Sequence, residues 1–223
     1  MRNHMKLKII PILLVFMITI VVAQDVAKTP GMESADDNDL QVGDIAPSWA
    51  LMYAPGKFEF LKNWSEEEGT RLRKLATQPN RHAVLMSFFA TWCQPCMKEL
   101  PILENVYQKY KDERIKFFLV DITEATRNNP GEVYGVAYKD VPDAEPFLRN
   151  KGVTMQILFD TRGVVMKNYN AQILPRLFLM DGNRKITLTR KGFHEGEEEK
   201  FTDELSDEIE RLLAELPEAK KRK

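Results

Sequence analysis

AVLMSFFATWCQPCMKELP, residues 83–101, is the stretch that decides the fold of this chain. It begins with an unbroken apolar run, which predicts a strand buried on both faces. Beyond it, apolar side chains recur with helical spacing. These side chains are Leu100, Leu103, Val106, Tyr107 and Tyr110. The sequence therefore predicts a central strand that turns directly into a helix.

The only two cysteines of the chain, Cys93 and Cys96, lie at this strand-to-helix junction. A thiolate at a helix N-terminus faces unpaired backbone N–H groups and the positive end of the helix dipole, so its pKa falls. The second cysteine lies less than one turn away and can close a disulfide with the first. We predict that Cys93 is the nucleophile and Cys96 the resolving thiol. Two unrelated buried cysteines, or half of a zinc site, are the alternatives.

The segment FATWCQPC, residues 89–96, followed by Glu99 and Pro101, resembles the thioredoxin superfamily. More narrowly, it resembles the TlpA/ResA-like thiol-disulfide oxidoreductases of the bacterial cell envelope. The resemblance covers roughly residues 42–216 and is strongest at 83–101 and 158–192. It implies an α/β, thioredoxin-like fold, in which helices flank a mixed central β-sheet and a helix–strand insertion is added.

The 223 residues, less a leader of 23, suit one domain with some extensions. A net charge of −1 gives no sign of a nucleic-acid partner. Two cysteines cannot form a structural disulfide framework, and a pair with C-x-x-C spacing is more often catalytic.

The N-terminus has the pattern of a secretory signal peptide over residues 1–23, with basic residues before an apolar run at 9–23. The run is short for a bilayer span of about 20 residues. An uncleaved membrane anchor, with residues 9–23 as the tether, is the alternative. Either one exports the rest of the chain, so we expect a periplasmic or otherwise extracytoplasmic protein.

Three further segments follow from composition and resemblance. Residues 24–41 are polar and acidic and predict a flexible linker. Residues 42–216 form the predicted thioredoxin-like domain, and 217–223 form a basic tail.

Two segments depart from the family pattern. In residues 61–82, Ser65 and Glu68 have capping-box spacing, which predicts an extra helix over about 65–77. Residues 123–142 are polar and longer than the expected connection, and we interpret them as a surface loop, with a role in partner recognition as the alternative.

The remaining elements follow from periodicity and turn signals. We expect the helix that begins at residue 93 to run to about residue 111, with a kink at Pro101. The other expected elements are a first strand or hairpin around 48–60, strands at 115–122, 153–159, 173–180 and 185–190, a short helix or turn at 164–169, and helices at 144–151 and 201–216.

The second candidate site is Pro175, which matches the cis-proline that thioredoxin-like folds place opposite the C-x-x-C pair. The resemblance implies that the backbone of Leu174 pairs with a bound substrate segment, as in strand addition. Trp92 is expected to pack beside Cys93 and to shape access to it.

Glu99 is the third candidate, because it follows Cys96 by three residues and lies on nearly the same helix face. A partly buried carboxylate there would have a raised pKa and could take the proton of Cys96. The TlpA/ResA-like group carries a glutamate at this spacing. The acid in the central strand of ordinary thioredoxins would fall at Ser87, which is uncharged. The alternative is a solvated surface glutamate.

These residues predict a thiol-disulfide oxidoreductase that reduces disulfides of envelope proteins, for example in cytochrome c maturation, and needs no metal or organic cofactor. A membrane thiol-disulfide carrier would supply the electrons, because the compartment is oxidising. The alternatives are an oxidase or isomerase that uses the same pair, and a copper- or metal-binding chaperone that adds His82 or His194 to the cysteines.

Overall fold

The apolar run forms β3 (Ala83–Phe89), and all of its residues are buried. It pairs in parallel with β4 (Ile115–Asp121) and in antiparallel with β6 (Arg176–Met180). The computed structural model describes residues 39–72, 80–128 and 140–216. Within these residues, the strands form one sheet in the order β2-β1-β5-β4-β3-β6-β7.

The outer strands make the sheet mixed, as predicted. On one side, β5 (Gln156–Phe159) pairs in parallel with β4, and the antiparallel hairpin of β1 (Ala50–Ala54) and β2 (Lys57–Phe60) continues the sheet. On the other side, β7 (Ile186–Lys191) pairs in antiparallel with β6. The carboxyl ends of the parallel strands β3, β4 and β5 therefore share one edge of the sheet.

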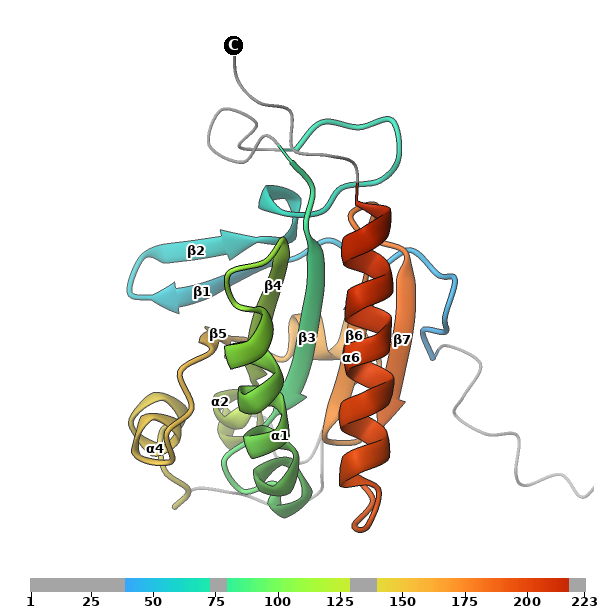
Figure 1. Ribbon diagram of the computed structural model, residues 1–223. Helices are drawn as coiled ribbons and strands as arrows, with labels where there is room; N and C mark the ends of the chain where they lie inside the picture. The colour runs from blue at the N-terminus through green and yellow to red at the C-terminus, as the bar shows by residue number, and fades with distance from the viewer. Residues whose placement is uncertain (1–38, 73–79, 129–139, 217–223) are drawn as a thin grey trace, which may run out of the picture. The chain divides into compact units, whose positions relative to one another are not determined.

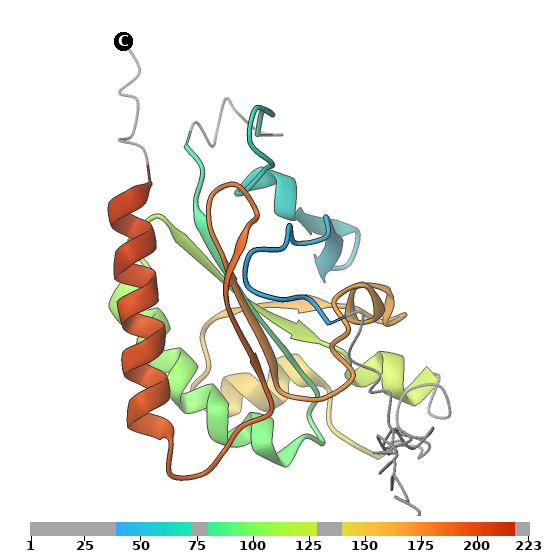
Figure 2. The same ribbon diagram turned by 90° about the vertical axis from the view of Figure 1, so that its right-hand side faces the viewer.

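Two long helices cover one face of the sheet (Figures 1 and 2). They are α1 (Gln94–Tyr110) and α6 (Glu198–Glu215). Each buries the apolar stripe that its sequence predicts, which in α6 consists of Phe201, Leu205, Ile209 and Leu212. The short helix α5 (Val164–Asn168) lies on the opposite face. The predicted α/β, thioredoxin-like fold is confirmed.

The helix predicted for 65–77 is wrong in the part of that segment that the structure describes. Residues 65–72 are not helical, and only a short 3-10 turn, η1 (Leu61–Asn63), precedes them. The Ser65 hydroxyl does not cap a helix but donates to the carbonyl oxygen of Asp181 at 2.9 Å. The Glu66 carboxylate pairs with Arg184 at 3.4 Å. Contacts with the β6–β7 turn therefore hold this segment.

The surface loop predicted for 123–142 begins instead as a helix, α2 (Thr123–Asn128). Its Thr123, Ala125 and Thr126 side chains are buried, so this helix belongs to the domain and not to its surface. Residues 129–139 lie outside the described residues. After them, α4 (Ala144–Asn150) matches the predicted helix at 144–151 and leads into β5.

The predicted leader at 1–23 and the basic tail at 217–223 lie outside the described residues, as does most of the linker predicted for 24–41. The last linker residues, 39–41, are described, and Asp39 forms ion pairs with the folded domain. Contacts with the domain thus begin three residues before its predicted boundary at 42. Across the described ranges, each helix is too short or too polar to cross a membrane.

Candidate functional site

The two cysteines lie where the strand turns into the helix, as predicted. Cys93 is the N-cap residue of α1, and a disulfide joins it to Cys96. The Cys96 backbone N–H donates to the Cys93 sulfur at 3.2 Å. Cys93 is 3% exposed and Cys96 is fully buried. A thiolate at Cys93 would therefore have a backbone donor and the positive helix end beside it, and both stabilise negative charge.

Helix α2 holds the turn before Cys93. The Thr91 backbone N–H donates to the Thr123 hydroxyl at 3.0 Å, and the Trp92 indole N–H donates to the Thr126 hydroxyl at 3.0 Å. The Asp121 carboxylate accepts from the Thr123 backbone N–H at 2.9 Å. Trp92 is half-buried beside the disulfide turn, as expected. The threonines of α2 could not be predicted from the sequence, because that segment has no apolar period.

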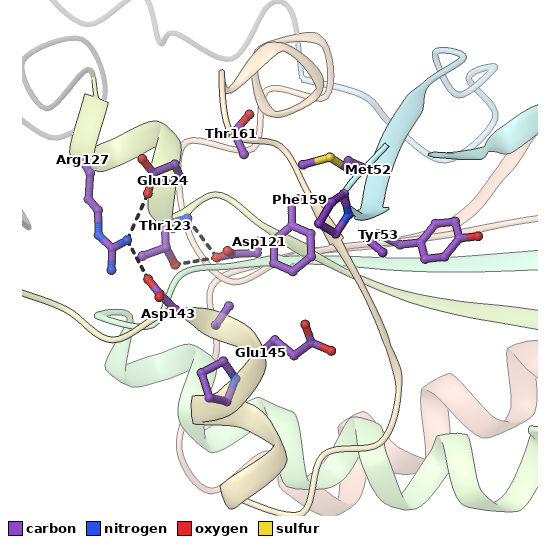
Figure 3. Close-up of a pocket in the computed structure, with 14 residues that line it drawn as sticks. Met52, Tyr53, Asp121, Thr123, Glu124, Arg127, Asp143, Glu145, Phe159 and Thr161 are labelled. Carbon is purple, nitrogen blue, oxygen red and sulfur yellow. Dashed lines mark hydrogen bonds and ion pairs between the residues drawn. The ribbon is translucent and has the colours of Figure 1, made fainter. Parts of the chain in front are cut away.

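A pocket of about 470 Å³ lies at the carboxyl ends of β4 and β5, beyond Asp121 and Thr123 (Figure 3). Burial raises the pKa of Asp121 to about 6, although hydrogen bonds from Thr123 oppose the shift. Arg127 forms ion pairs with Glu124 at 3.0 Å and with Asp143 at 2.9 Å. The pocket therefore borders the hydrogen bonds that hold the Trp92–Cys93 turn.

Glu99 is buried on the same helix as Cys96, and its side chain faces the sheet. It is 2% exposed, and the Ser87 hydroxyl of β3 donates to its Oε2 at 2.9 Å. Burial raises the pKa of Glu99 to about 7, while the Ser87 hydrogen bond and the charge of Arg190 limit the rise. Glu99 is therefore buried more completely than the partial burial that was expected, and burial shifts its pKa in the expected direction. The hydrogen bond from Ser87 was not foreseen.

Pro175 follows a cis peptide bond with Leu174, as its resemblance to the family's cis-proline implied. Because Arg176 pairs with Phe88 across the sheet, Pro175 lies at the end of β3 where the cysteine turn begins. Its carbonyl oxygen accepts from the Gly192 N–H at 2.8 Å. Ile173 is 55% exposed and Leu174 is half-buried, so part of this segment borders solvent beside the disulfide turn.

The part of the chain that the structure describes contains no group of three or more His, Cys, Asp or Glu residues that could hold a metal ion. The His82 ring packs edge-on against Trp64, at 5.2 Å between centroids. Burial lowers the pKa of His82 to about 4. This arrangement gives the metal-chaperone alternative no support from His82.

Two features define a thioredoxin-like protein. One is a C-x-x-C disulfide at the start of the helix that follows a central strand, and the other is a cis-proline at the same edge of the sheet. The Redoxin family matches residues 41–205 of the chain, which therefore belongs to that family.

Two curated relatives are similar over much of the chain. The thiol-disulfide oxidoreductase ResA of Bacillus thuringiensis subsp. konkukian (strain 97-27) is 24% identical over 156 residues, which are 70% of this chain and 73% of that protein. The sporulation thiol-disulfide oxidoreductase A of Bacillus subtilis (strain 168) is 27% identical over 115 residues, which are 51% of this chain and 62% of that protein.

Solved structures agree on the fold. The thioredoxin domain of a thiol-disulfide oxidoreductase from Bacteroides vulgatus has a TM-score of 0.52 at 17% identity, over 78% of this chain and 99% of that one. A thiol:disulfide interchange protein of Chlorobium tepidum TLS has a TM-score of 0.50 at 16% identity, over 78% of this chain and 99% of that one.

Proposed function

We propose that this protein is a thiol-disulfide oxidoreductase that reduces disulfides in proteins of the cell envelope, for example in cytochrome c maturation. One observation carries the proposal. The Cys93–Cys96 pair lies at the N-terminus of α1, and a buried carboxylate, Glu99, follows one turn later on the same helix. This arrangement supplies a nucleophile, a resolving thiol and a proton acceptor.

The reaction is thiol-disulfide exchange in two steps. In the reduced protein, the Cys93 thiolate attacks one sulfur of a substrate disulfide, so that a mixed disulfide forms and the other substrate sulfur leaves as a thiolate. Cys96 then attacks the Cys93 sulfur and displaces the second substrate thiolate. The substrate gains two electrons and, from solvent and Cys96, two protons, while the protein ends with the Cys93–Cys96 disulfide.

Glu99 serves the second step in this proposal. Cys96 is fully buried, so its proton needs an acceptor within the domain before the thiol can attack. A carboxyl group with a pKa of about 7 exchanges a proton readily near neutral pH. Ser87 holds this carboxylate, because its hydroxyl donates to Oε2.

Substrate binding is assigned to Trp92, Leu174 and Pro175. Leu174, a half-buried residue, precedes β6 at the same sheet edge as Cys93, so an extended substrate segment can pair with its backbone. The Trp92 ring, which Thr126 holds, limits access to Cys93 from the side of α2.

The direction of electron flow follows from the dipeptide between the cysteines. Neither Gln94 nor Pro95 is a histidine, the residue that stabilises the thiolate in strong oxidants of this superfamily. We therefore favour reduction of substrates over the oxidase and isomerase alternatives. A membrane thiol-disulfide carrier would reduce the resting disulfide, and the leader pattern at 1–23 supports an extracytoplasmic location, cleaved or tethered.

The reduction potential of the Cys93–Cys96 pair tests this proposal. We expect a value near that of thioredoxin, about −270 mV, when the protein is equilibrated with a thiol buffer. A value near −120 mV would mean an oxidant. The Cys93→Ser protein is the control and should transfer no electrons to a disulfide substrate. Transfer by that variant would contradict the mechanism, and a pair that forms no internal disulfide would contradict the redox function itself.

A further inference from the structure

A buried ion cluster lies behind the segment that carries Leu174 and Pro175. Arg176, the first residue of β6, is 2% exposed, and its guanidinium group lies over the Phe178 ring at 4.5 Å. The Asp39 carboxylate, 7% exposed, lies 3.1 Å from Arg176 Nη2 and 2.9 Å from Lys191 Nζ. Two cations thus meet one carboxylate at the start of β6.

The same carboxylate reaches the other end of that segment. The Asn170 side-chain amide donates to Asp39 Oδ1 at 3.3 Å. We call residues 170–176 the proline loop. Asp39 therefore contacts both the first and the last residue of the proline loop with one oxygen, while its second oxygen is held by Lys191 of β7. Because Arg176 and Lys191 are register partners, the cluster also ties the loop to the β6–β7 ladder.

The backbone that follows Asp39 is held by hydrogen bonds, which fix the position of the carboxylate. Arg176 also donates to the carbonyl oxygen of Leu40 at 3.3 Å. Residues 43–46 then run along the start of β7 and the β6–β7 turn. The Gly43 N–H donates to the Ile186 carbonyl of β7 at 2.8 Å, and the Ala46 N–H donates to the Arg184 carbonyl of the turn at 2.8 Å. This short extension places Asp39 at the end of β7 that is nearest the proline loop.

We propose that Asp39 is a positioning residue for substrate binding, which holds both ends of the proline loop in the conformation that presents the Leu174 backbone. The inference rests on the proposed function, since it assumes that substrate pairs with that backbone. Asp39 touches neither cysteine, so it acts on how well a substrate segment docks and not on the exchange chemistry.

The test compares Asp39→Asn with Asp44→Asn in the full chain. Asp44 lies in the same extension but is exposed, and its carboxylate accepts from the Gln41 N–H at 2.8 Å, away from the proline loop. Each pre-reduced protein is mixed with a peptide that contains one internal disulfide, and separately with the small aromatic disulfide DTNB, which is too short to pair along the loop.

For Asp39→Asn we expect the half-saturating peptide concentration to rise about tenfold. This rise would result if the fraction of molecules with the proline loop in its binding conformation fell to about a tenth. The limiting rate and the rate with DTNB should stay at the wild-type value. Asp39→Glu, which keeps the charge, should recover part of the loss, and Asp44→Asn should resemble wild type. An unchanged half-saturation in Asp39→Asn, or equal losses with peptide and DTNB, would overturn the proposal.

A second readout does not depend on activity. The Gly192 N–H donates to the Pro175 carbonyl oxygen, so its hydrogen exchange reports whether the proline loop stays in place. We expect faster exchange in Asp39→Asn than in Asp44→Asn, and equal exchange would contradict the inference. If wild-type protein reduced neither disulfide, the proposed function would fail while this measurement still decided the role of Asp39.

Should Asp39→Asn not fold, Lys191→Gln takes its place. The Lys191 side chain is 30% exposed and contacts the other oxygen of Asp39, so its loss should be tolerated more easily. We expect a smaller rise in half-saturation, in the same direction, with the DTNB rate unchanged. A Lys191→Gln protein with wild-type half-saturation and wild-type Gly192 exchange would contradict the proposal.

Discussion

Ser87 takes the place where ordinary thioredoxins carry a buried acid, and in this protein it serves an acid on the neighbouring helix. Its hydroxyl donates to Glu99 Oε2 at 2.9 Å, in a region where both side chains are buried. A hydrogen bond to the charged form of a carboxyl group lowers its pKa. Ser87 therefore offsets part of the rise that burial imposes on Glu99.

We expect Ser87→Ala to raise the pKa of Glu99 above its present value of about 7. A hydrogen bond to a charged group contributes about 1.5–3 kcal/mol, which corresponds to roughly one to two pH units. In the proposed mechanism Glu99 accepts the Cys96 proton and must be ionised to do so. The rate of mixed-disulfide resolution should therefore reach its plateau at higher pH. Single-turnover rates of resolution, measured at intervals of about one pH unit between about pH 5 and pH 9, would give the shift in pKa.

Ser65→Ala is the matched control for that experiment. It also removes a buried hydroxyl with one hydrogen bond, at 2.9 Å to the Asp181 carbonyl, but it lies at the opposite end of the sheet from Cys93. It should lower stability without moving the pH profile. A pH profile that is unchanged in Ser87→Ala, or shifted equally in both variants, would show that Ser87 has only a structural role and does not set the pKa of Glu99.

At the scale of elements, an ion pair holds the segment that the capping-box pattern had wrongly assigned to a helix. Arg184, in the β6–β7 turn, has a side chain 7% exposed and donates to the Ala46 carbonyl at 3.0 Å. Its carboxylate partners are Glu66, 8% exposed, at 3.4 Å and Glu67, 53% exposed, at 3.0 Å. A buried guanidinium group needs such partners, because its desolvation is costly.

We expect Glu66→Ala to lower the free energy of unfolding by about 2 kcal/mol, since it leaves the buried Arg184 with only an exposed carboxylate. Glu68→Ala removes an exposed glutamate two residues away and should change stability by less than about 0.5 kcal/mol. Urea denaturation of the two variants would measure both values. Equal free energies of unfolding in the two variants would show that Glu67 alone is a sufficient partner for the Arg184 guanidinium group.

The elements that sequence patterns predicted well are those with a strong apolar period. β3, α1 and α6 follow directly from their apolar spacing, and resemblance located Pro175 and Glu99. Helix α2 could not be predicted in this way, because its buried side chains are Thr123, Ala125 and Thr126, which give no apolar stripe. Small polar residues become buried there only because the Thr91–Trp92 turn supplies hydrogen-bonding partners.

Long-range contacts explain what sequence could not show about the site. Asp39 lies in an acidic stretch that reads as solvated linker, and its partners Asn170, Arg176 and Lys191 come more than 130 residues later. Ser65 and Glu68 have the spacing of a helix start, yet Ser65 bonds Asp181 of the distant hairpin. Local propensity was overridden in both places by partners that only the folded sheet brings near.

At the scale of the whole molecule, the burial of Glu99 makes stability depend on pH. Its pKa rises from 4.5 to about 7 on folding, mainly through burial. Between those values the folded protein keeps a proton that the unfolded chain has already lost. Stability therefore falls as pH rises through this window, and it levels off above about pH 7. Asp121 adds a similar fall at lower pH, since burial raises its pKa from 3.8 to about 6.

In the Glu99→Gln protein, the free energy of unfolding should lack the decrease with rising pH that Glu99 causes in wild type. Each pKa unit corresponds to about 1.4 kcal/mol, so the stability of the variant relative to wild type should rise by about 3 kcal/mol from pH 4 to pH 8. Urea denaturation at several pH values would measure this difference.

Asp121→Asn is the control for this experiment. Its gain in stability relative to wild type should be complete near pH 6, before the gain of Glu99→Gln ends. A difference in stability between wild type and Glu99→Gln that stays constant with pH would mean that folding does not change the pKa of Glu99, so that Glu99 would be fully ionised well below pH 7. It could then not exchange a proton with Cys96 near neutrality, and the assignment of Glu99 as the acceptor would fail together with the stability prediction.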